Sequence, residues 1–389
     1  MTHKFVNIHE LISHNPSCLN RDDMNMQKSA VFGGVRRIRI SSQCLKRAYR
    51  SSEAYKKFAK SVRTGSYENM RAYLKANFSD TNENVLEYVL RVAMPKEKVI
   101  TAWTEGEAEA LIKTVESVLA DNGLDADILA ELLPSDEAEE ETEETEEKGT
   151  KKKKQKKLSK EAEDLGKKLS KAIEITEEAF IKSGISSVDV ALSGRMCASG
   201  VLENVEAAMS VAHAITTHSM ETEIDWFTAM DDLKEDTGAG HLNTQEFGAG
   251  VFYQYASIDV DLLAQNMGTD RKEALAVISA WLRIMATVTP SGKQHTFASH
   301  SLAHSVMVSM SDMPLSLANA FENPIKKDRE GYAKASTDAM LDYWSKLNNA
   351  YEIDEKAAIF ALDGSPKCSD KVSKFKTLRE LQSWVEEDN

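Results

Sequence analysis

One stretch of the chain, residues 24–50, contains seven Lys and Arg and no Asp or Glu. The whole chain is acidic, with 62 Asp and Glu against 48 Lys and Arg and a formal net charge of −14. A basic stretch in an acidic protein produces a local positive field that favours a polyanion, most simply nucleic acid. The cations are Lys28, Arg36, Arg37, Arg39, Lys46, Arg47 and Arg50.

A strand and a helix start are expected to position these cations. Residues 35–40 alternate as a strand does, with Arg37 and Arg39 on one face. Ser41 is suited to cap a helix over 43–55, where free N–H groups and the helix dipole favour a phosphate. The spacing of Lys46, Arg47 and Arg50 places all three on one side of that helix. The pattern predicts one positive corner; the alternative is a solvated basic face balanced by acids elsewhere.

Two adjacent acids, Asp22 and Asp23, precede the basic stretch. Such a pair can hold a divalent metal for phosphodiester cleavage, but it more often caps a turn or pairs with a nearby Arg. His9 and His14 are five residues apart, whereas a zinc-protease helix needs histidines four apart. The sequence therefore indicates neither a metal site nor a cofactor.

Apolar side chains also occur where no core is expected. Trp226 and Phe227 are neighbours in a polar, glycine-bearing stretch, 219–250, which we expect to be an extended loop or hairpin. They suit either anchoring of that loop or stacking on bases. Met196 follows a turn at 193–195 and presents the same two alternatives.

Composition is that of a soluble globular protein, with 42% hydrophobic and 28% charged residues. No apolar run is long enough to cross a bilayer, and the polar first residues do not resemble a secretory signal. The four cysteines lie far apart, which is typical of reduced thiols. We expect a cytoplasmic protein.

Strand and helix patterns alternate along the chain and predict an α+β fold. Strands are expected at 4–12, 186–192, 251–257 and 306–311, with a loop opening at Asn15–Pro16. Helices are expected over much of 53–133 and at 160–182, 203–218, 258–286 and 377–387. Residues 136–147 hold nine acids and 148–160 eight lysines, so 134–160 is predicted to be a solvated insertion. A lysine arm touching nucleic acid is the alternative.

Several blocks together resemble the CasC family, the multicopy backbone subunit of the type I-E CRISPR Cascade complex. They cover both ends of the chain, whereas residues 53–180 do not match in detail. The blocks are Asn20-Arg21-Asp22-Asp23, Met26-Gln27-Lys28, Phe32-Gly33-Gly34, residues 37–48, 189–196, 208–218, 223–229 and 244–247, Gly292-Lys293-Gln294, and residues 311–321.

This resemblance implies an RRM-like (ferredoxin-like) palm sheet with inserted helical fingers and a protruding thumb. The palm would comprise 1–58, 183–219 and 252–389, the fingers 59–182 and the thumb 220–251. Family members stack along CRISPR RNA, grip its sugar-phosphate backbone and leave bases free to pair with target DNA. The implied partners are this RNA, the target DNA, further copies of the chain (about six,) and other Cascade subunits.

The resemblance also assigns roles to residues, without catalysis. Trp226, Phe227, Thr228 and Met196 would displace a base at regular intervals. The RNA backbone would be bound by Arg21, Lys28, Arg37, Arg39, Ser41, Gln43, Lys46, Arg47 and Arg50. Two alternatives stay open: a backbone subunit that also cleaves target RNA through Asp22 or Asp23, and an oligomer whose basic patch binds an acidic protein.

Overall fold

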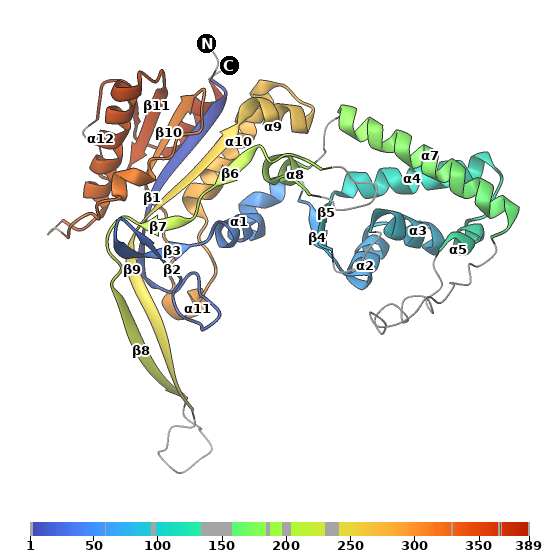
Figure 1. Ribbon diagram of the computed structural model, residues 1–389, viewed down its shortest axis with the longest axis horizontal. Helices are drawn as coiled ribbons and strands as arrows, with labels where there is room; N and C mark the ends of the chain where they lie inside the picture. Colours follow the sequence, from blue (N-terminus) through green and yellow to red (C-terminus); the bar gives the residue numbers. More distant parts are fainter. Residues whose placement is uncertain are drawn as a thin grey trace, which may run out of the picture. The chain divides into compact units, whose positions relative to one another are not determined.

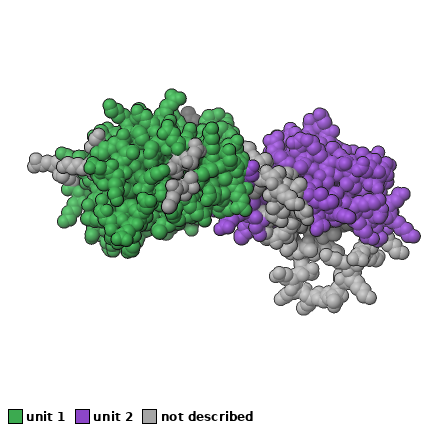
Figure 2. Space-filling view, turned by 90° about the horizontal axis from the view of Figure 1, so that it is seen from above, with its two compact units in different colours: residues 1–58, 208–265, 269–389 green, residues 59–207, 266–268 purple. Residues whose placement is uncertain are grey.

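The computed structural model describes residues 3–58, 60–94, 99–133, 158–183, 187–196, 204–229, 241–327, 330–364, 366 and 368–387. The chain divides into two compact units, drawn in different colours in Figure 2. Unit 1 comprises 1–58, 208–265 and 269–389, and unit 2 comprises 59–207 and 266–268. In the described part of the chain, no helix combines the length and apolar character that a membrane span needs.

Unit 1 is built on one large, mostly antiparallel sheet to which ten of the described strands belong. Its strand order is β12-β11-β10-β1-β9-β7-β3-β2, with β6 and β8 also paired to β9 (Figure 1). The strands are β1 (Phe5–Ser17), β2 (Ser29–Phe32), β3 (Val35–Ile40), β6 (Met209–Val211), β7 (Ala214–Thr216), β8 (Thr222–Ala229), β9 (His241–Asp259), β10 (Ala303–Ser311), β11 (Lys356–Ala361) and β12 (Val372–Phe375).

Helices cover the sheet of unit 1. Tyr49 of α1 packs edge-on against Trp281 of α10, with ring centroids 5.2 Å apart. Tyr253 of β9 belongs to another buried cluster, together with Phe321 of η3 and Trp344 of α12. The helices are α1 (Ser42–Ser51), η1 (Glu53–Lys57), α9 (Val260–Met267), α10 (Arg271–Thr287), α11 (Gln294–Phe297), η3 (Ala318–Phe321), α12 (Ala333–Tyr351) and α13 (Leu378–Glu386).

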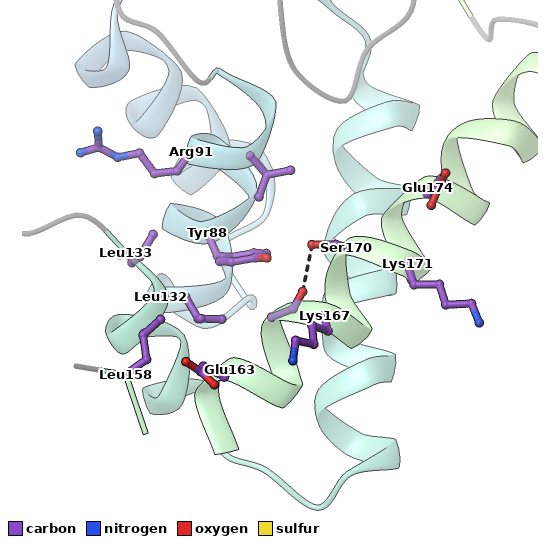
Figure 3. A pocket seen from close by; sticks show the side chains of 12 residues that line it. Tyr88, Arg91, Leu132, Leu133, Leu158, Glu163, Lys167, Ser170, Lys171 and Glu174 are labelled. Atoms are coloured by element: carbon purple, nitrogen blue, oxygen red, sulfur yellow. Dashed lines mark hydrogen bonds between the residues drawn. The ribbon is translucent and has the colours of Figure 1, made fainter. Parts of the chain in front are cut away.

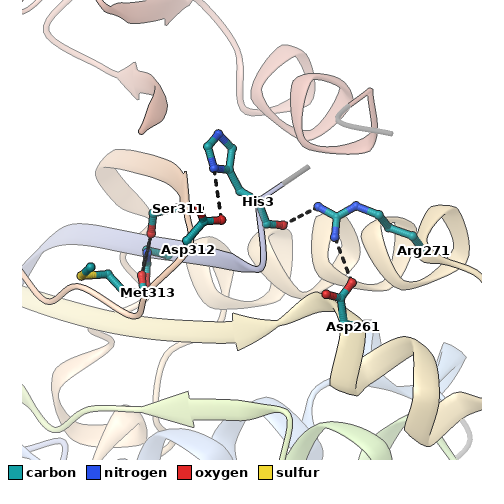
Figure 4. A network of polar contacts seen from close by, with 7 residues as sticks. His3, Asp261, Arg271, Ser311, Asp312 and Met313 are labelled. Atoms are coloured by element: carbon teal, nitrogen blue, oxygen red, sulfur yellow. Dashed lines mark hydrogen bonds and ion pairs between the residues drawn. The ribbon is translucent and has the colours of Figure 1, made fainter. Parts of the chain in front are cut away.

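The start of the chain is tied down by polar contacts (Figure 4). Arg271 donates through Nη2 to the backbone oxygen of His3 at 2.6 Å and forms an ion pair with Asp261 at 3.3 Å. The Nδ1 atom of His3 lies 3.6 Å from an Asp312 carboxylate oxygen. These contacts fix the strand entry of β1 against α10 and against the loop that follows β10.

Unit 2 is mostly helical around its own core, which includes Trp103, Leu111 and Leu169. A small two-stranded antiparallel sheet pairs Val62 with Trp103. The capping box of α4, formed by Thr104 and Glu107, satisfies two helix-end donors. The elements are β4 (Val62–Thr64), α2 (Tyr67–Asn77), α3 (Glu83–Ala93), β5 (Thr101–Trp103), α4 (Glu105–Asp121), η2 (Ala126–Ile128), α5 (Leu129–Leu132), α7 (Lys160–Ser183) and α8 (Val188–Ser193).

Two secondary-structure predictions are wrong. The helix expected over 203–218 is replaced by β6 and β7, which pair with β9. The strand expected at 186–192 is the helix α8, whose Asp189 is buried and bonded to Ser61. In both places, pairing with residues distant in sequence outweighs local propensity.

Other boundaries also differ from the predictions. The first strand runs through Asn15 and Pro16, because a register irregularity between His14 and Ser17 accommodates the proline. Residues 187–196 lie in unit 2. Most of the charged insertion, 134–157, lies outside the described residues.

Candidate nucleic-acid interface

Backbone hydrogen bonds bring the loop before β2 alongside β3. The amide of Arg39 donates to the Lys28 oxygen at 2.9 Å, and the amide of Lys28 donates to the Asn20 oxygen at 2.9 Å. The Arg39 guanidinium in turn lies 2.9 Å from Nδ1 of His213, just before β7. Loop, strand and a later part of the chain therefore meet at one place.

Lys28, Arg39, Arg47 and His213 make up what we call the basic cluster. Burial lowers the pKa of His213, and the charges of Arg39 and Lys28 lower it further. Burial raises the pKa of the Cys44 thiol, whereas the charges of Lys28 and Arg47 oppose that rise. The positive charges of Lys28, Arg39 and Arg47 therefore act on neighbouring groups, although these residues come from a loop, a strand and a helix. In the described chain, no carboxylate pairs with Lys28, Arg39 or Arg47.

The start of α1 is capped as predicted. Ser41 is the N-cap, and its hydroxyl accepts from the Cys44 amide at 3.3 Å. Its own amide donates to Asn20 Oδ1 at 2.9 Å, and the residue is only 7% exposed. Gln43 and Arg47 are exposed on the helix, and Lys46 and Arg50 are half-buried. The helix start therefore presents its side chains, rather than the Ser41 hydroxyl, to a ligand.

Arg37 corrects the expectation of an exposed arginine pair on β3. Its side chain is fully buried. The guanidinium donates to the backbone oxygens of Phe32, Thr216, Phe321 and Glu322 at 2.8–3.3 Å. Arg37 therefore joins two strands to the segment after β10 and does not reach a surface ligand.

The loop at 20–28 is held by its own polar side chains. Asp22 Oδ1 accepts from the amides of Met24 and Met26 at 3.0 and 2.9 Å. Asp22 thus caps a turn, which is one of the two roles that the sequence allowed for it. Arg21 donates to Asn25, a residue with φ of 65°. Arg21, Asp22 and Asp23 line an open cavity of about 410 Å³ beside this loop.

Lys293 is a cation near the 20–28 loop that was not among the predicted RNA-contact residues. It precedes α11. Burial raises the pKa of the Cys18 thiol, and the positive charges of Arg21 and Lys293 both oppose that rise. A side chain on the preceding Gly292 would come within 2.4 Å of the Leu19 oxygen, so only glycine permits this approach. The block Gly292-Lys293-Gln294 is one of those that resemble the CasC family, and this resemblance could have pointed to Lys293.

The residues predicted to displace a base belong to different units of the chain. Met196, in unit 2, is 87% exposed and follows Arg195, whose guanidinium bonds the Glu107 carboxylate at 2.7 and 2.9 Å. Trp226 and Phe227 lie on β8, 66% and 42% exposed. As neighbours in a strand they point to opposite faces of the β8–β9 hairpin, so they do not form one stacking platform. The side chain of Thr228 lies outside those described.

A further cavity, of about 900 Å³, lies in unit 2 between α3, α5 and α7 (Figure 3). Tyr88 and Leu132 supply apolar lining, and Glu163 and Lys167 lie along α7. None of the predicted RNA-contact residues lines it. Among the described residues, no group of three or more His, Cys, Asp or Glu is placed to hold a metal ion.

Comparisons with known proteins agree along nearly the whole chain. The sequence model of the family described as CT1975-like protein matches residues 6–386. A solved structure described as "CRISPR RNA-guided surveillance complex, pre-nicking" has a similar chain, with 26% identity and a TM-score of 0.74 over 98% of this chain and 99% of that one.

Another solved structure, described as "CRISPR RNA-guided surveillance complex", shares the fold at 22% identity and a TM-score of 0.58. That likeness covers 98% of this chain and 99% of the other. No curated protein matches. Because the family match spans almost the entire sequence, this chain belongs to the CT1975-like protein family.

Proposed function

We propose that this protein is a CRISPR RNA-binding backbone subunit of a Cascade-type surveillance complex, as the CasC resemblance of its sequence implies. Copies polymerise along the guide RNA, about six in number, and other Cascade subunits complete the complex. The guide's bases are presented for pairing with target DNA. The protein acts in the cytoplasm and is not itself an enzyme.

The likeness to a solved surveillance-complex chain over the full length of both chains is the observation that carries this proposal. The basic cluster supports it, because it gathers positive charge in a chain with a net charge of −14. A guide must be held by its phosphates, since spacer sequences vary and only the guide's bases should read the target.

The topology of unit 1 supports an RRM-like palm. The strand order β10-β1-β9-β6, all antiparallel, is that of a ferredoxin-like sheet, with α1 following β1 and α10 following β9. In this proposal the β8–β9 hairpin is the thumb, and unit 2 contains the fingers.

The residue roles are proposed from charge and exposure. Met196 and Trp226 displace bases, at an unstacking cost of a few kcal/mol each. Gln43 hydrogen-bonds sugar or phosphate at the start of α1. The phosphate contacts are made by Arg21, Lys28, Arg39, Lys46, Arg47, Arg50 and Lys293.

The native complex tests the proposal directly. We expect the protein to purify with short RNAs that share a repeat-derived end and differ in their spacers, as read by sequencing of the co-purified nucleic acid. Absence of RNA would favour the alternative of an oligomer that binds an acidic protein.

The assignment as a non-enzyme has its own test. The assembled complex is incubated with Mg²⁺ and an RNA complementary to the guide, and the RNA is followed on a denaturing gel. We expect intact RNA. Regularly spaced cleavage products that vanish in Asp22→Asn or Asp23→Asn would replace this assignment with a target-cleaving subunit.

A further inference from the structure

The outer edge of β12 is an open edge of the sheet in unit 1. β12 is the last strand in the sheet order, and within the described part of the chain β11 is the only strand paired with it. The opposite end of that order is formed by β2 and β3, and β3 carries Arg39 of the basic cluster. An open strand edge presents unpaired backbone N–H and C=O groups, with which an extended segment of another chain can pair. This edge therefore offers a binding surface that is separate from the basic cluster.

The two sides of β12 differ in chemistry. Val372 belongs to the buried cluster that includes Trp344 of α12. Successive side chains of a strand alternate, so Lys374 lies on the same side as Val372, and it is exposed. Phe375 points to the opposite side, where it pairs with Phe360 of β11, and both rings are half-buried. A partner strand would thus meet a cation on one side and aromatic rings on the other.

Lysines gather along this edge. Lys371, Lys374 and Lys376 are all exposed. Among the described residues, no carboxylate lies within ion-pair distance of Lys371 or Lys374. Lysines discourage two identical edges from pairing with each other, because like charges would then face one another. An acidic segment, by contrast, brings opposite charges to the same lysines.

A pocket lies next to the edge, on the side of Phe375. It has a volume of about 520 Å³, and its lining includes Phe375 and the half-buried Trp384 of α13. The Glu380 carboxylate accepts hydrogen bonds from the Lys376 and Thr377 amides at 2.8 and 3.0 Å. These bonds fix the turn from β12 to α13, so the pocket is present without a partner. Protection of the edge from unwanted pairing would need the lysines but not this pocket.

Exposed carboxylates favour a peptide over a nucleic acid at this edge. Glu387 lines the pocket, and Asp370 directly precedes Lys371; both side chains are exposed. A nucleic-acid strand carries a negative charge at every phosphate and would be repelled by these two groups. A peptide can place its acids opposite the lysines and an apolar side chain in the pocket, because alternate residues of a strand point to opposite sides.

We propose that the β12 edge docks an extended, acidic segment of a partner protein, which adds to the sheet as a further strand. Its acidic side chains meet Lys371 and Lys374, and its alternate, apolar side chains enter the pocket lined by Phe375 and Trp384. Charge complementarity and the unpaired edge both select this occupant. The inference goes beyond the proposed function and does not depend on RNA binding.

Peptide binding to the full-length chain tests the docking site. The probe is a fluorescein-labelled peptide of about nine residues, the length of a long strand, in which Glu and Val alternate. A peptide of the same composition, with all its Glu residues at one end, is the control for simple charge attraction. In fluorescence polarisation we expect the alternating peptide to bind about tenfold more tightly than the control peptide.

Two variants separate the charged and apolar parts of the site. Lys371→Glu/Lys374→Glu should weaken binding of the alternating peptide about tenfold or more, because like charges then face each other. Lys160→Glu/Lys272→Glu makes the same change in net charge at the starts of α7 and α10 and should leave the affinity unchanged. Ser383→Trp puts a ring into the pocket from an exposed helix position and should weaken binding about fivefold. Circular dichroism checks that each variant is folded.

Several outcomes would overturn the inference. They are equal binding of the two peptides, no binding by the wild-type chain at about 1 mM peptide, and full affinity in Lys371→Glu/Lys374→Glu or in Ser383→Trp. A single-stranded oligonucleotide is titrated in parallel. If its affinity falls in Lys371→Glu/Lys374→Glu but not in Lys160→Glu/Lys272→Glu, the edge binds nucleic acid instead. Failure of the proposed function would leave the peptide result unchanged, since the peptide is titrated without RNA.

Discussion

Arg37 and Arg39 lie two residues apart on β3, yet their surroundings are opposite. Arg37 is fully buried and donates to four backbone oxygens. Arg39 is half-buried and lies beside His213 in the basic cluster. The segment at Phe321–Glu322 packs against Arg37 and accepts its hydrogen bonds, and this contact explains why Arg37 is buried. Alternation along a strand shows which side chains share a face, but it does not show what covers them.

Arg195 extends the comparison to unit 2. It too is buried, but its charge is balanced by the Glu107 carboxylate, whereas Arg37 is held by backbone carbonyl oxygens and lies over the Phe32 ring. An arginine cannot shed its proton, so a buried one needs either a counter-charge or several acceptors. Substitution of the two interior arginines should therefore lower the free energy of unfolding by different amounts. Substitution of the surface cations should change it very little.

The largest loss is expected for Arg195→Met. It leaves the Glu107 carboxylate buried without its counter-charge, so the free energy of unfolding of unit 2 should fall by about 3–5 kcal/mol. Urea denaturation followed by far-UV circular dichroism measures it. Adding Glu107→Gln should recover part of the loss, because the unpaired charge is then gone while the amide oxygen can still accept from the Thr104 amide. If the double variant is no more stable than Arg195→Met, the ion pair is not the cause.

Arg37→Met should cost somewhat less, about 3 kcal/mol, because it strands neutral carbonyls rather than a charge. Thermal unfolding monitored by circular dichroism gives the value. Arg36→Met is the matched control on the same strand. Arg36 is exposed, so its loss should change stability by less than about 0.5 kcal/mol. Equal losses in the two variants would contradict the assigned role of Arg37.

Buried histidines avoid this problem by staying neutral. Burial lowers the pKa of His9 to about 3 and that of His14 to about 4. Because the folded values lie below the ordinary 6.5, the stability these groups contribute is present above pH 6.5 and is lost as pH falls. Each should cost up to about 1.4 kcal/mol per pH unit below 6.5.

His14→Phe should remove the part of this pH-dependent loss of stability that comes from His14, down to about pH 4. An aromatic ring still faces Phe252 in this variant. Chemical denaturation of both proteins between pH 7 and 5 gives the difference in slope. Glu10, whose pKa is raised by burial, acts in the opposite direction in both proteins and cancels in the comparison. Parallel pH profiles would show that His14 does not resist protonation.

The smallest effect on stability is expected for Lys28→Ala/Arg39→Ala/Arg47→Ala, within about 0.5 kcal/mol, because none of these side chains is fully buried. RNA affinity should nevertheless fall uniformly across spacer sequences. The slope of log affinity against log salt should shrink by about two for three lost phosphate contacts. Filter binding at several salt concentrations tests this, and losses confined to particular spacers would argue against phosphate gripping.

Local signals made part of the fold predictable. The β3 strand and the Ser41 cap follow from alternation and capping chemistry, and the β8–β9 hairpin follows from its polar, glycine-bearing stretch. The β6–β7 segment was not predictable, because its alanines favour a helix until β9 is available to pair. The same holds for the site: the cations could be listed from sequence, but the burial of Arg37 depends on a segment almost 300 residues away.

The interruption of unit 1 by unit 2 bears on synthesis at the ribosome. Phe5 of β1 pairs with Ser311 and Asp259, so β1 lacks both neighbouring strands until those residues emerge. Residues 59–207 form most of unit 2 and are translated without interruption. The helical unit can therefore fold first, while β1, whose Val6, Ile8 and Leu11 are buried in the finished fold, remains without its partner strands. Chaperone demand during translation should accordingly concentrate on the first strand of the chain.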